Sequence, residues 1–580
     1  IVLIVFSPLL TLTGLEGKLF TPVALTIVFA MFSALLLSLT VVPIVASLLI
    51  NENSAKMPKL VEILQRYYKT SLQKTLEKPR ILLLVVVSML ILSMFFFAFI
   101  GKIFMPVLDE GDVIVQLEKT PGISLQASIA LDQQVEKKLL ESIPEIKQIV
   151  ARTGSDEIGL DPMGLNETDI FMELYPVSQW RFDSKELLID EIRKVLLKFP
   201  GINFGFTQPI QMRVSEMLTG SSGDISIKVF GEKISVLSSI VLQTSEIARD
   251  IEGSVDVQAS VIEGGKFLNI EVYSKMAKRY EMSVNDFSRY IKSQLEGIVV
   301  SELIEGKKRT PIVVANSPNS EQYLSTIAEL KNHLVIMPDA SLAPLNDIAH
   351  ISYKEGPLLI EREKGNRFAD VTSNVAGRDI VGFVEDLDSA IKEKIDLPTG
   401  YSIVFGGEFE NQARATNNLL MVIPVALLLI MIILFTTFQS LAKAGLILAN
   451  IPFAIMGGII ALFLSGEYLS VPASVGLIAL LGVAVLNGVV MVSYFEQTRL
   501  TINDLSFRII DGSVRRLRPI LMTATTAMFG LLPLVFASGP GAEIQKPLAI
   551  VVIGGLLTST LTTLYLLPLF YYRMENKANV

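Results

Sequence analysis

The sequence predicts a polytopic α-helical membrane protein that carries a large α+β region outside the bilayer. Of its 580 residues, 51% are hydrophobic, and the apolar residues are concentrated in uncharged runs long enough to cross a membrane. A polar stretch at about 105–414 separates two blocks of these runs and is far too long for a connecting loop. Within it, patterns typical of strands and of helices alternate.

The first block of apolar runs predicts three membrane segments. We expect residues 1–13 to be the end of one spanning helix, and residues 22–50 and 81–101 to be complete spans. The segment 51–80 between them is basic and amphipathic, which is typical of a helix lying on the cytoplasmic surface. The second block, 417–572, predicts five more spans, at about 419–437, 444–464, 471–494, 520–537 and 548–571.

The short loops between these runs predict the orientation. Lys and Arg collect in 51–80, at Lys443, in 499–518, and at Arg573 and Lys577, whereas the alternate loops are nearly free of them. Positive loops favour the cytoplasmic side, so in a bacterial inner membrane the region 105–414 would be periplasmic. Because the chain starts inside an apolar run that lacks the features of a signal peptide, we also expect it to be a fragment cut within a spanning helix.

The region 105–414 predicts three units. Residues 105–200 form one βαβ-rich unit, and residues 201–264 with 355–410 form a second. Such patterns are typical of ferredoxin-like, split βαβ subdomains. Residues 265–354 have a strand and helix pattern of their own and interrupt the second unit, so we expect an inserted subdomain.

Composition excludes several functions. The net charge is −8, which gives no basic surface for nucleic acid. Cys is absent and only two His occur, so thiolate sites, disulfides and histidine-rich metal sites are excluded. No Walker A motif or hydrolase signature is present, which disfavours an enzyme or an ATP-driven pump. Carboxylates without thiols or clustered His instead suit divalent cations of hard or borderline character and disfavour Cu(I) or Ag(I).

Three groups of polar residues are candidates for a site, each with a plainer alternative. Asp109, Glu110 and Asp112 follow a span and would line an entrance or simply end the helix. In the loop 156–169, Gly and Pro prevent core packing, so its acids face water or a ligand. Arg213 and Glu216 would form a gate, a metal ligand or an ordinary surface ion pair. The acids of the second group are Asp156, Glu157, Asp161, Glu167 and Asp169.

The expected spans contain no titratable side chain that would relay protons. They offer Asn487 together with Thr523, Thr525 and Thr526, which do not exchange protons near neutral pH. Hydrogen bonding between helices is the alternative to a role in the relay.

Several long motifs resemble one family. They are LTLTGLEGKLFTPVALT, FMPVLDEGD, GLIALLGVAVLNGVVM, SVRRLRPILMTATTAMFGLLPL and GPGAEIQKPLAIVVIGGLLTSTLTTLYLLPLFY. Together they resemble the heavy-metal efflux branch of the resistance–nodulation–division (RND) transporters, of the cobalt–zinc–cadmium type. The resemblance implies a homotrimeric inner-membrane antiporter with twelve spans, of which this chain would hold the end of the fifth to the twelfth. It also implies a periplasmic adaptor and an outer-membrane channel as partners, with residues 265–354 as part of the docking domain.

The same resemblance implies particular site residues. The three Met that bind the ion in copper and silver members correspond here to Gln116, Glu167 and Glu216. Polar positions along the route to the cleft correspond to the residues Glu110, Asp161, Asp169 and Arg213, and we count Asp169 as a further candidate ligand.

The resemblance also bears on energy coupling. The Glu of the tenth span in the copper and silver members corresponds to Asn487, and the Lys of the eleventh span corresponds to Ile520, so the relay does not carry over directly. The relay Asp of the family belongs to the fourth span, outside this chain.

We therefore predict a proton-driven exporter of divalent metal ions such as Zn²⁺, Co²⁺, Cd²⁺ or Ni²⁺, with membrane lipid around it and no cofactor besides the transported ion. Two alternatives stay open. An RND exporter of organic compounds should have a cleft rich in Phe, and a membrane-anchored module would bind or assemble without transport.

Overall fold

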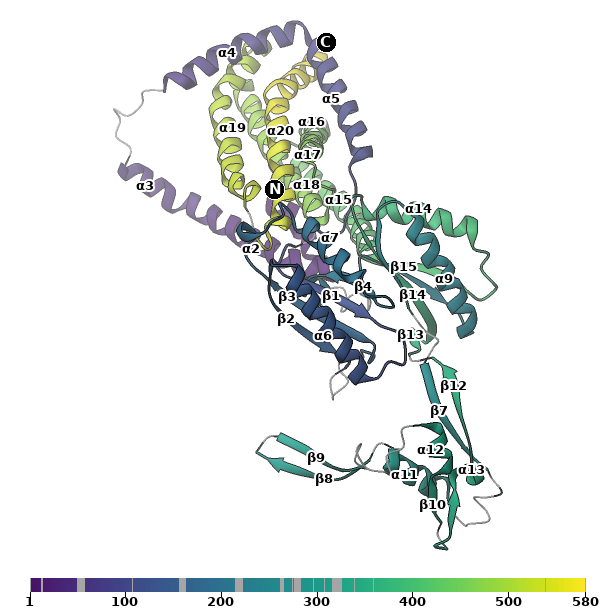
Figure 1. Ribbon diagram of the computed structural model, residues 1–580. Coiled ribbons are helices and arrows are strands. Elements are labelled where there is room, and N and C mark those ends of the chain that lie inside the picture. The colour runs from purple at the N-terminus through teal and green to yellow at the C-terminus, as the bar shows by residue number, and fades with distance from the viewer. Residues whose placement is uncertain are drawn as a thin grey trace.

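In the computed structural model, a bundle of long helices continues into two α+β subdomains, and a small unit lies beyond them (Figure 1). The predicted fold class is confirmed. The structure describes all residues except 1, 12–13, 50–57, 107, 156–162, 214–222, 261–264, 274, 276–282, 296, 307, 316–325, 338, 358, 538 and 579–580.

Within the described residues, seven helical segments are long and apolar enough to cross a membrane: Gly17–Leu39, Pro79–Phe99, Glu408–Phe438, Leu441–Ser465, Val471–Gln497, Leu505–Val535 and Ala542–Asn576. The helices of this bundle are α1 (Val2–Phe6), η1 (Ser7–Thr11), α2 (Gly14–Leu39), α3 (Val41–Leu49), α5 (Pro79–Phe99), α15 (Glu408–Phe438), α16 (Leu441–Leu448), α17 (Ile451–Ser465), α18 (Val471–Gln497), η4 (Thr498–Leu500), α19 (Leu505–Val535) and α20 (Ala542–Ala578).

Some helices extend beyond the apolar runs that predicted them. Helix α19 starts at Leu505, well before the apolar run at 520–537, because its first turns are basic but still helical. Conversely, the run at 22–50 is interrupted at Thr40, between α2 and α3. An apolar run marks the part of a helix that suits lipid and does not mark where the backbone hydrogen bonding ends.

The basic segment before α5 contains helix α4 (Lys59–Glu77), which lies across one end of the bundle (Figure 1). Its inner face packs on the bundle through Tyr68 and Leu72, which are almost fully buried. Ile63 and Tyr67 are 65% and 74% exposed on its outer side. This amphipathic arrangement is typical of a helix at a membrane surface.

The first subdomain (residues 113–207) has one four-stranded antiparallel sheet. Its elements are β1 (Val113–Glu118), α6 (Leu125–Ser142), β2 (Ile146–Thr153), β3 (Glu167–Leu174), η3 (Val177–Gln179), α7 (Lys185–Leu196) and β4 (Asn203–Thr207). The strand order β2-β3-β1-β4 is that of a ferredoxin-like, split βαβ unit. The core lies between one face of the sheet and helices α6 and α7, with Val115, Ile170, Leu188 and Ile192 at its centre.

The second subdomain (residues 225–259 and 361–407) repeats this arrangement. Its elements are β5 (Ile225–Phe230), α9 (Ile234–Asp250), β6 (Ser254–Ala259), β13 (Glu361–Glu363), β14 (Asn366–Val375), α14 (Ile380–Lys394) and β15 (Ser402–Gly407). Strand β14 pairs with both β5 and β6, and β15 pairs with the other edge of β5. Helices α9 and α14 cover one face of this sheet, so its other face is left to interact elsewhere.

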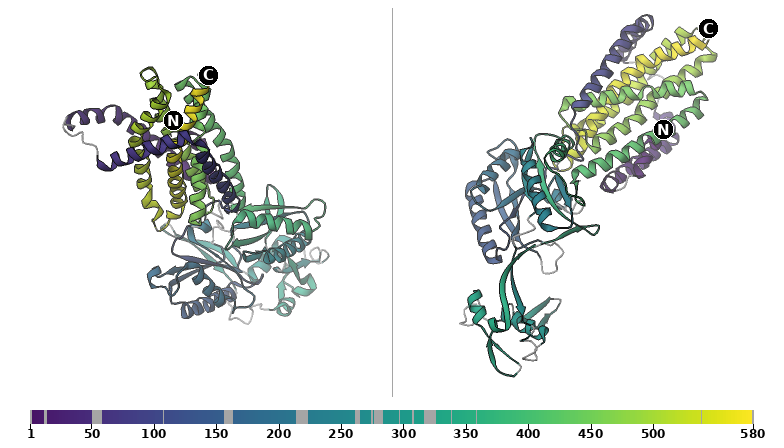
Figure 2. Two further views of the ribbon diagram at one scale, coloured as in Figure 1. Left: turned by 90° about the horizontal axis from the view of Figure 1, so that it is seen from above. Right: turned by 90° about the vertical axis from the view of Figure 1, so that its right-hand side faces the viewer.

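An inserted unit (residues 265–356) interrupts the second subdomain between β6 and β13. A long antiparallel pair connects it to the body (Figures 1 and 2). Beyond this pair lie a small core and a two-stranded arm whose residues are all exposed. Its elements are β7 (Gly265–Val272), α11 (Val284–Leu295), β8 (Ile298–Glu305), β9 (Lys308–Val314), α12 (Ile327–Asn332), β10 (Leu334–Ile336), β11 (Leu342–Pro344), α13 (Leu345–Ile348) and β12 (Ala349–Gly356).

Candidate functional site: a cleft between two sheets

The open face of the first sheet carries a row of polar groups. Residues directly opposite one another on antiparallel strands point to the same face, and the register places Arg152, Asp169, Gln116 and Gly205 in line across β2, β3, β1 and β4. Gln116 Nε2 donates to Asp169 Oδ1 over 3.3 Å, and an Arg152 guanidinium nitrogen donates to Asp169 Oδ2 over 2.5 Å. Two of the predicted ligands, Gln116 and Asp169, are thus brought together.

A second row lies one step further along the same strands. Glu167 of β3 is directly opposite Glu118 of β1, and Glu118 is opposite Asn203 of β4. Burial raises the pKa of Glu118 to about 7. The hydrogen bond with Asn203 opposes this rise, and the charges of Glu167 and Asp370 add to it. Glu118 therefore holds a proton over part of the neutral pH range.

The open face of the second sheet lies across from these rows. Thr372 of β14 and Gln258 of β6 are directly opposite each other, and Asp370 lies two residues before Thr372. Asp370 is almost fully buried, which raises its pKa, and it accepts a hydrogen bond from Ser226 Oγ over 3.1 Å. Polar side chains of both subdomains therefore face a common space, which we call the cleft.

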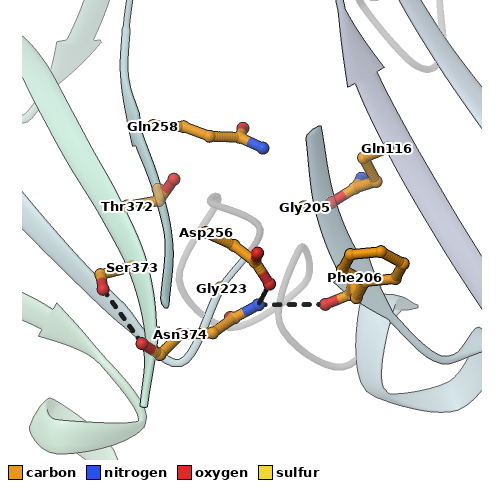
Figure 3. Close-up of a pocket in the computed structure, with 9 residues that line it drawn as sticks. All are labelled: Gln116, Gly205, Phe206, Gly223, Asp256, Gln258, Thr372, Ser373 and Asn374. Atoms are coloured by element: carbon orange, nitrogen blue, oxygen red, sulfur yellow. Dashed lines mark hydrogen bonds between the residues drawn. The ribbon is translucent and has the colours of Figure 1, made fainter. Parts of the chain in front are cut away.

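A pocket within the cleft shows how the sheets meet (Figure 3). About 240 Å³ of empty space, open in part to solvent, is lined by Gln116, Gly205, Phe206, Gly223, Asp256, Gln258, Thr372, Ser373 and Asn374. The two faces lie close together at Gly205, where an added Cβ atom would lie 2.8 Å from Gln258 Nε2. Glycine at this position allows the two faces to come together.

Acidic groups from both sheets influence one another across the cleft. Burial raises the pKa of Glu361, in β13, to about 7. The charges of Asp370 and Glu167 contribute to that rise, and Lys228 opposes it. In the part of the chain that the structure describes, however, no three Asp, Glu or His side chains are grouped closely enough to hold a metal ion. The arrangement places several carboxyl groups around one cleft. To bind a metal ion, these carboxyl groups would have to move closer together or be joined by additional ligands.

The other predicted ligands and path residues are positioned as follows. Glu167 accepts a hydrogen bond at Oε2 from the Gly164 backbone over 3.0 Å, which fixes the start of β3. Glu216 and Asp161 lie outside the described residues. Arg213 is exposed at the end of the helical turn 209–213. Its side chain is not free, because it makes a contact with another group.

Glu110 has a clear structural role. Its carboxylate accepts hydrogen bonds from the Ile210 backbone at 2.8 Å and from the Gln211 backbone at 3.3 Å. These amides begin the helical turn 209–213, so Glu110 caps it. The neighbouring Asp109 pairs with Lys185 at 2.8 Å. Glu110 and Asp109 therefore connect the segment before β1 to later parts of the first subdomain. These contacts explain both carboxylates without a role at an entrance.

In the bundle, Asn487 and Thr523 meet between α18 and α19. Thr523 Oγ1 lies 3.5 Å from Asn487 Oδ1 and donates to the Ile520 carbonyl over 2.9 Å. This contact has the form of the expected hydrogen bond between helices, and whether it takes part in a relay stays a prediction.

Sequence reasoning did not single out Glu118, Glu361 or Asp370. Glu118 lies on β1, and the alternation of side chains along a strand places it on the same face as Gln116. That signal could have identified Glu118. Asp370 and Glu361 had no comparable signal, because only the pairing of distant strands brings them opposite the first sheet.

These features define a membrane protein whose helical bundle carries two facing ferredoxin-like subdomains. The family model described as AcrB/AcrD/AcrF matches residues 1–575, and the chain belongs to that family. This match and the relatives named below confirm the resemblance to heavy-metal RND transporters.

Curated relatives point in the same direction. The chain is 37% identical over 582 residues to the cobalt-zinc-cadmium resistance protein CzcA of Cupriavidus metallidurans, covering 100% of this chain and 55% of the relative. It is 32% identical to the cation efflux system protein CusA of Escherichia coli K12, covering 99% of this chain and 56% of the relative. A crystal structure of a heavy metal efflux pump superposes with a TM-score of 0.87 at 30% identity, over 99% of this chain and 56% of that one. The chain thus spans about half the length of the proteins it matches.

Proposed function

We propose that this chain supplies the cargo cleft and the membrane helices that carry it in a proton-driven exporter of divalent heavy-metal cations. The observation that carries the proposal is the pair of open sheet faces, which set Glu118 and Glu167 against Asp370 and Glu361. Carboxylate and amide groups without thiols favour Zn²⁺, Co²⁺, Cd²⁺ or Ni²⁺ over Cu(I) and Ag(I).

The raised pKa values link cargo to protons. At a pH near 7, Glu118 and Glu361 are partly protonated, and a divalent cation that binds them must displace those protons. The cleft then takes up an ion with release of protons and releases the ion when protons return. The energy-coupling relay itself is assigned to no residue of this chain, although Asn487 and Thr523 remain candidates for supporting it.

The proposal extends to assembly and location. The distribution of Lys and Arg among the short loops supports an inner-membrane position with the cleft on the periplasmic side. Relatives named as cation efflux and metal resistance proteins support a role in export. We propose a homotrimer that works with a periplasmic adaptor and an outer-membrane channel, toward which the inserted unit projects. Glu167, Gln116 and Asp169 are further candidate cleft ligands. Glu216, which lies outside the described residues, is a candidate on the resemblance alone.

Equilibrium dialysis of the purified chain in detergent tests the cargo. Zn²⁺, Co²⁺, Cd²⁺ and Ni²⁺ are each compared with Cu(I), Ag(I) and a cationic dye, and bound metal is counted by mass spectrometry. We expect binding of the divalent ions that is lost in a Glu118→Gln, Glu361→Gln double variant. Retention in the matched surface variant Glu141→Gln, on the outer face of α6, would show that the loss is local.

The same assay separates the alternatives. Binding of the dye without binding of divalent metals would overturn the proposal in favour of an exporter of organic compounds. The pocket makes this outcome unexpected, because Phe206 is the single aromatic residue among its nine described lining residues. Absence of binding to every probe would favour a module that does not transport.

A further inference from the structure

The contacts between the two subdomains converge on Asp256. This residue lies in β6 where its pairing with β14 shifts register, opposite the step between Thr372 and Asn374. Its φ is 53°, in the left-handed region that residues other than glycine rarely adopt. A β-bulge redirects a side chain, and an unfavourable backbone conformation persists only where surrounding contacts impose it. Contacts around Asp256 therefore impose its backbone conformation.

The Asp256 carboxylate reaches across to the first subdomain. Arg193 of α7 donates to it through Nε at 3.2 Å and through a terminal nitrogen at 3.1 Å and 3.2 Å. The Asp256 side chain is 4% exposed and that of Arg193 is 25% exposed. The guanidinium group also lies over the Phe206 ring at 5.1 Å. Such a forked, shielded pair holds two surfaces in one geometry.

Asn374 adds a second link between the subdomains (Figure 3). Its Nδ2 donates to the Phe206 carbonyl over 3.1 Å and to Asp256 Oδ2 over 3.4 Å. Its Oδ1 accepts from the Asp224 backbone over 3.2 Å. The Asp224 carbonyl in turn accepts from the backbone nitrogen of Glu408, the first residue of α15, over 2.9 Å. One hydrogen-bonded chain therefore runs from the first subdomain to a membrane helix.

We propose that Arg193, Asp256 and Asn374 form a clamp that holds the two subdomains in the closed arrangement, and that the cleft opens when these contacts break. The clamp borders the pocket without using the acidic groups assigned to cargo. That the clamp controls access of cargo rests on the proposed function. That it holds the two subdomains together does not depend on what the protein transports. Through Asp224, hydrogen bonds also connect Asn374 of the clamp to the start of helix α15.

The absence of Cys makes the test clean. Cysteines placed at Lys137 in α6 and Glu246 in α9, both exposed on the outer helices of the two subdomains, carry spin labels. Double electron–electron resonance on the full chain measures the distance distribution between them. Loss of an ionic hydrogen-bonded contact should raise the population at long distances by about tenfold or more. We expect this rise in Arg193→Ala.

The matched control is Arg181→Ala. Arg181 makes the same forked contact with Glu145, at 2.7 Å and 2.9 Å, but within the first subdomain alone. Its distance distribution should not change. An equal widening in the control would overturn the proposal, because it would show general loosening.

Two milder variants keep the test decisive if Arg193→Ala fails to fold. Asp256→Asn retains a residue that tolerates the left-handed conformation but removes the charge. Asn374→Ala removes only the amide contacts. Unchanged distributions in both, with native circular dichroism, would overturn the clamp. Metal binding is measured separately by dialysis. If the clamp variants widen the distance distribution but the unchanged chain binds no metal, the proposed function is refuted and the clamp is not.

Discussion

Glu118 and Glu167 lie directly opposite each other on neighbouring strands and point into the same cleft. Like charges in directly opposed positions are destabilising, and burial adds to the cost because it disfavours the ionised form. This pair is therefore kept at an energetic cost, which a cation or a proton in the cleft would offset.

The free energy of unfolding should depend on pH because of this pair. The pKa of Glu118 is raised from an ordinary value of 4.5 to about 7. Between these values the folded state binds more protons than the unfolded state, so the contribution of Glu118 to stability falls as the pH rises through this window. Glu118→Gln should raise the free energy of unfolding at pH 8 by on the order of 1–2 kcal/mol, allowing for partial solvent screening.

The measurement for Glu118 is denaturant unfolding of the detergent-solubilised chain at pH 4 and pH 8. The variant should gain stability at pH 8 and little at pH 4. A gain of the same size at both pH values would contradict the assigned pKa.

Divalent metal binding should depend on pH. Because Glu118 and Glu361 both have a pKa near 7, the apparent Zn²⁺ affinity should rise between pH 6 and pH 8, by up to about tenfold per pH unit for each proton displaced. Calorimetry in buffers of different ionisation enthalpy counts the released protons. Glu361→Gln should release fewer protons, and an affinity that is flat with pH would exclude these carboxyls as ligands.

Lys119 and Asp132 form a buried ion pair in the first subdomain, and loss of one partner alone should be costly. Their side chains are 1% and 3% exposed and lie 2.8 Å apart. Lys119 also donates to Ser128 and Thr168, at 2.7 Å and 2.6 Å. Lys119→Met leaves a buried, unpaired carboxylate and should cost about 3–5 kcal/mol.

The double variant Lys119→Met, Asp132→Leu is the control for this pair. It removes both charges and should recover much of the lost stability. Denaturant unfolding of the unchanged chain, of the single variants Lys119→Met and Asp132→Leu, and of the double variant gives the coupling energy. Strictly additive losses would show that the two residues do not act as a pair.

We expect Asn450 to stabilise the bundle through hydrogen bonds to helix α20. It lies at the break between α16 and α17, where its Nδ2 donates to Thr563 Oγ1 over 2.6 Å and its Oδ1 accepts from Thr562 Oγ1 over 2.6 Å. Asn450→Ala should cost about 1 kcal/mol in detergent, typical of polar contacts between membrane helices.

Thermal unfolding of Asn450→Ala is compared with that of Thr525→Ala. Among the described residues, the Thr525 hydroxyl donates to carbonyls of its own helix, those of Leu521 and Met522. Equal losses in the two variants would argue against a special role for Asn450.

The sequence by itself indicated which runs suit a membrane, the ferredoxin-like units, and an acidic, thiol-free composition for the region that holds the cleft. Each of these depends on local periodicity or on composition, because an uncharged run suits lipid and alternation along a strand selects a face. The position of Gln116 beside Asp169 was foreseeable only by resemblance, since strand register depends on pairing.

The tertiary structure alone decided which distant groups meet. Asp370 and Glu361 oppose Glu118 only because two separate sheets turn their open faces toward each other, and Asp256 reaches Arg193 only because a bulge redirects it. The capping role of Glu110 likewise depends on contact with a segment 100 residues away. Local sequence patterns set faces and spans, whereas pairing between segments far apart in the chain is fixed by packing, and packing is what assembled the cleft.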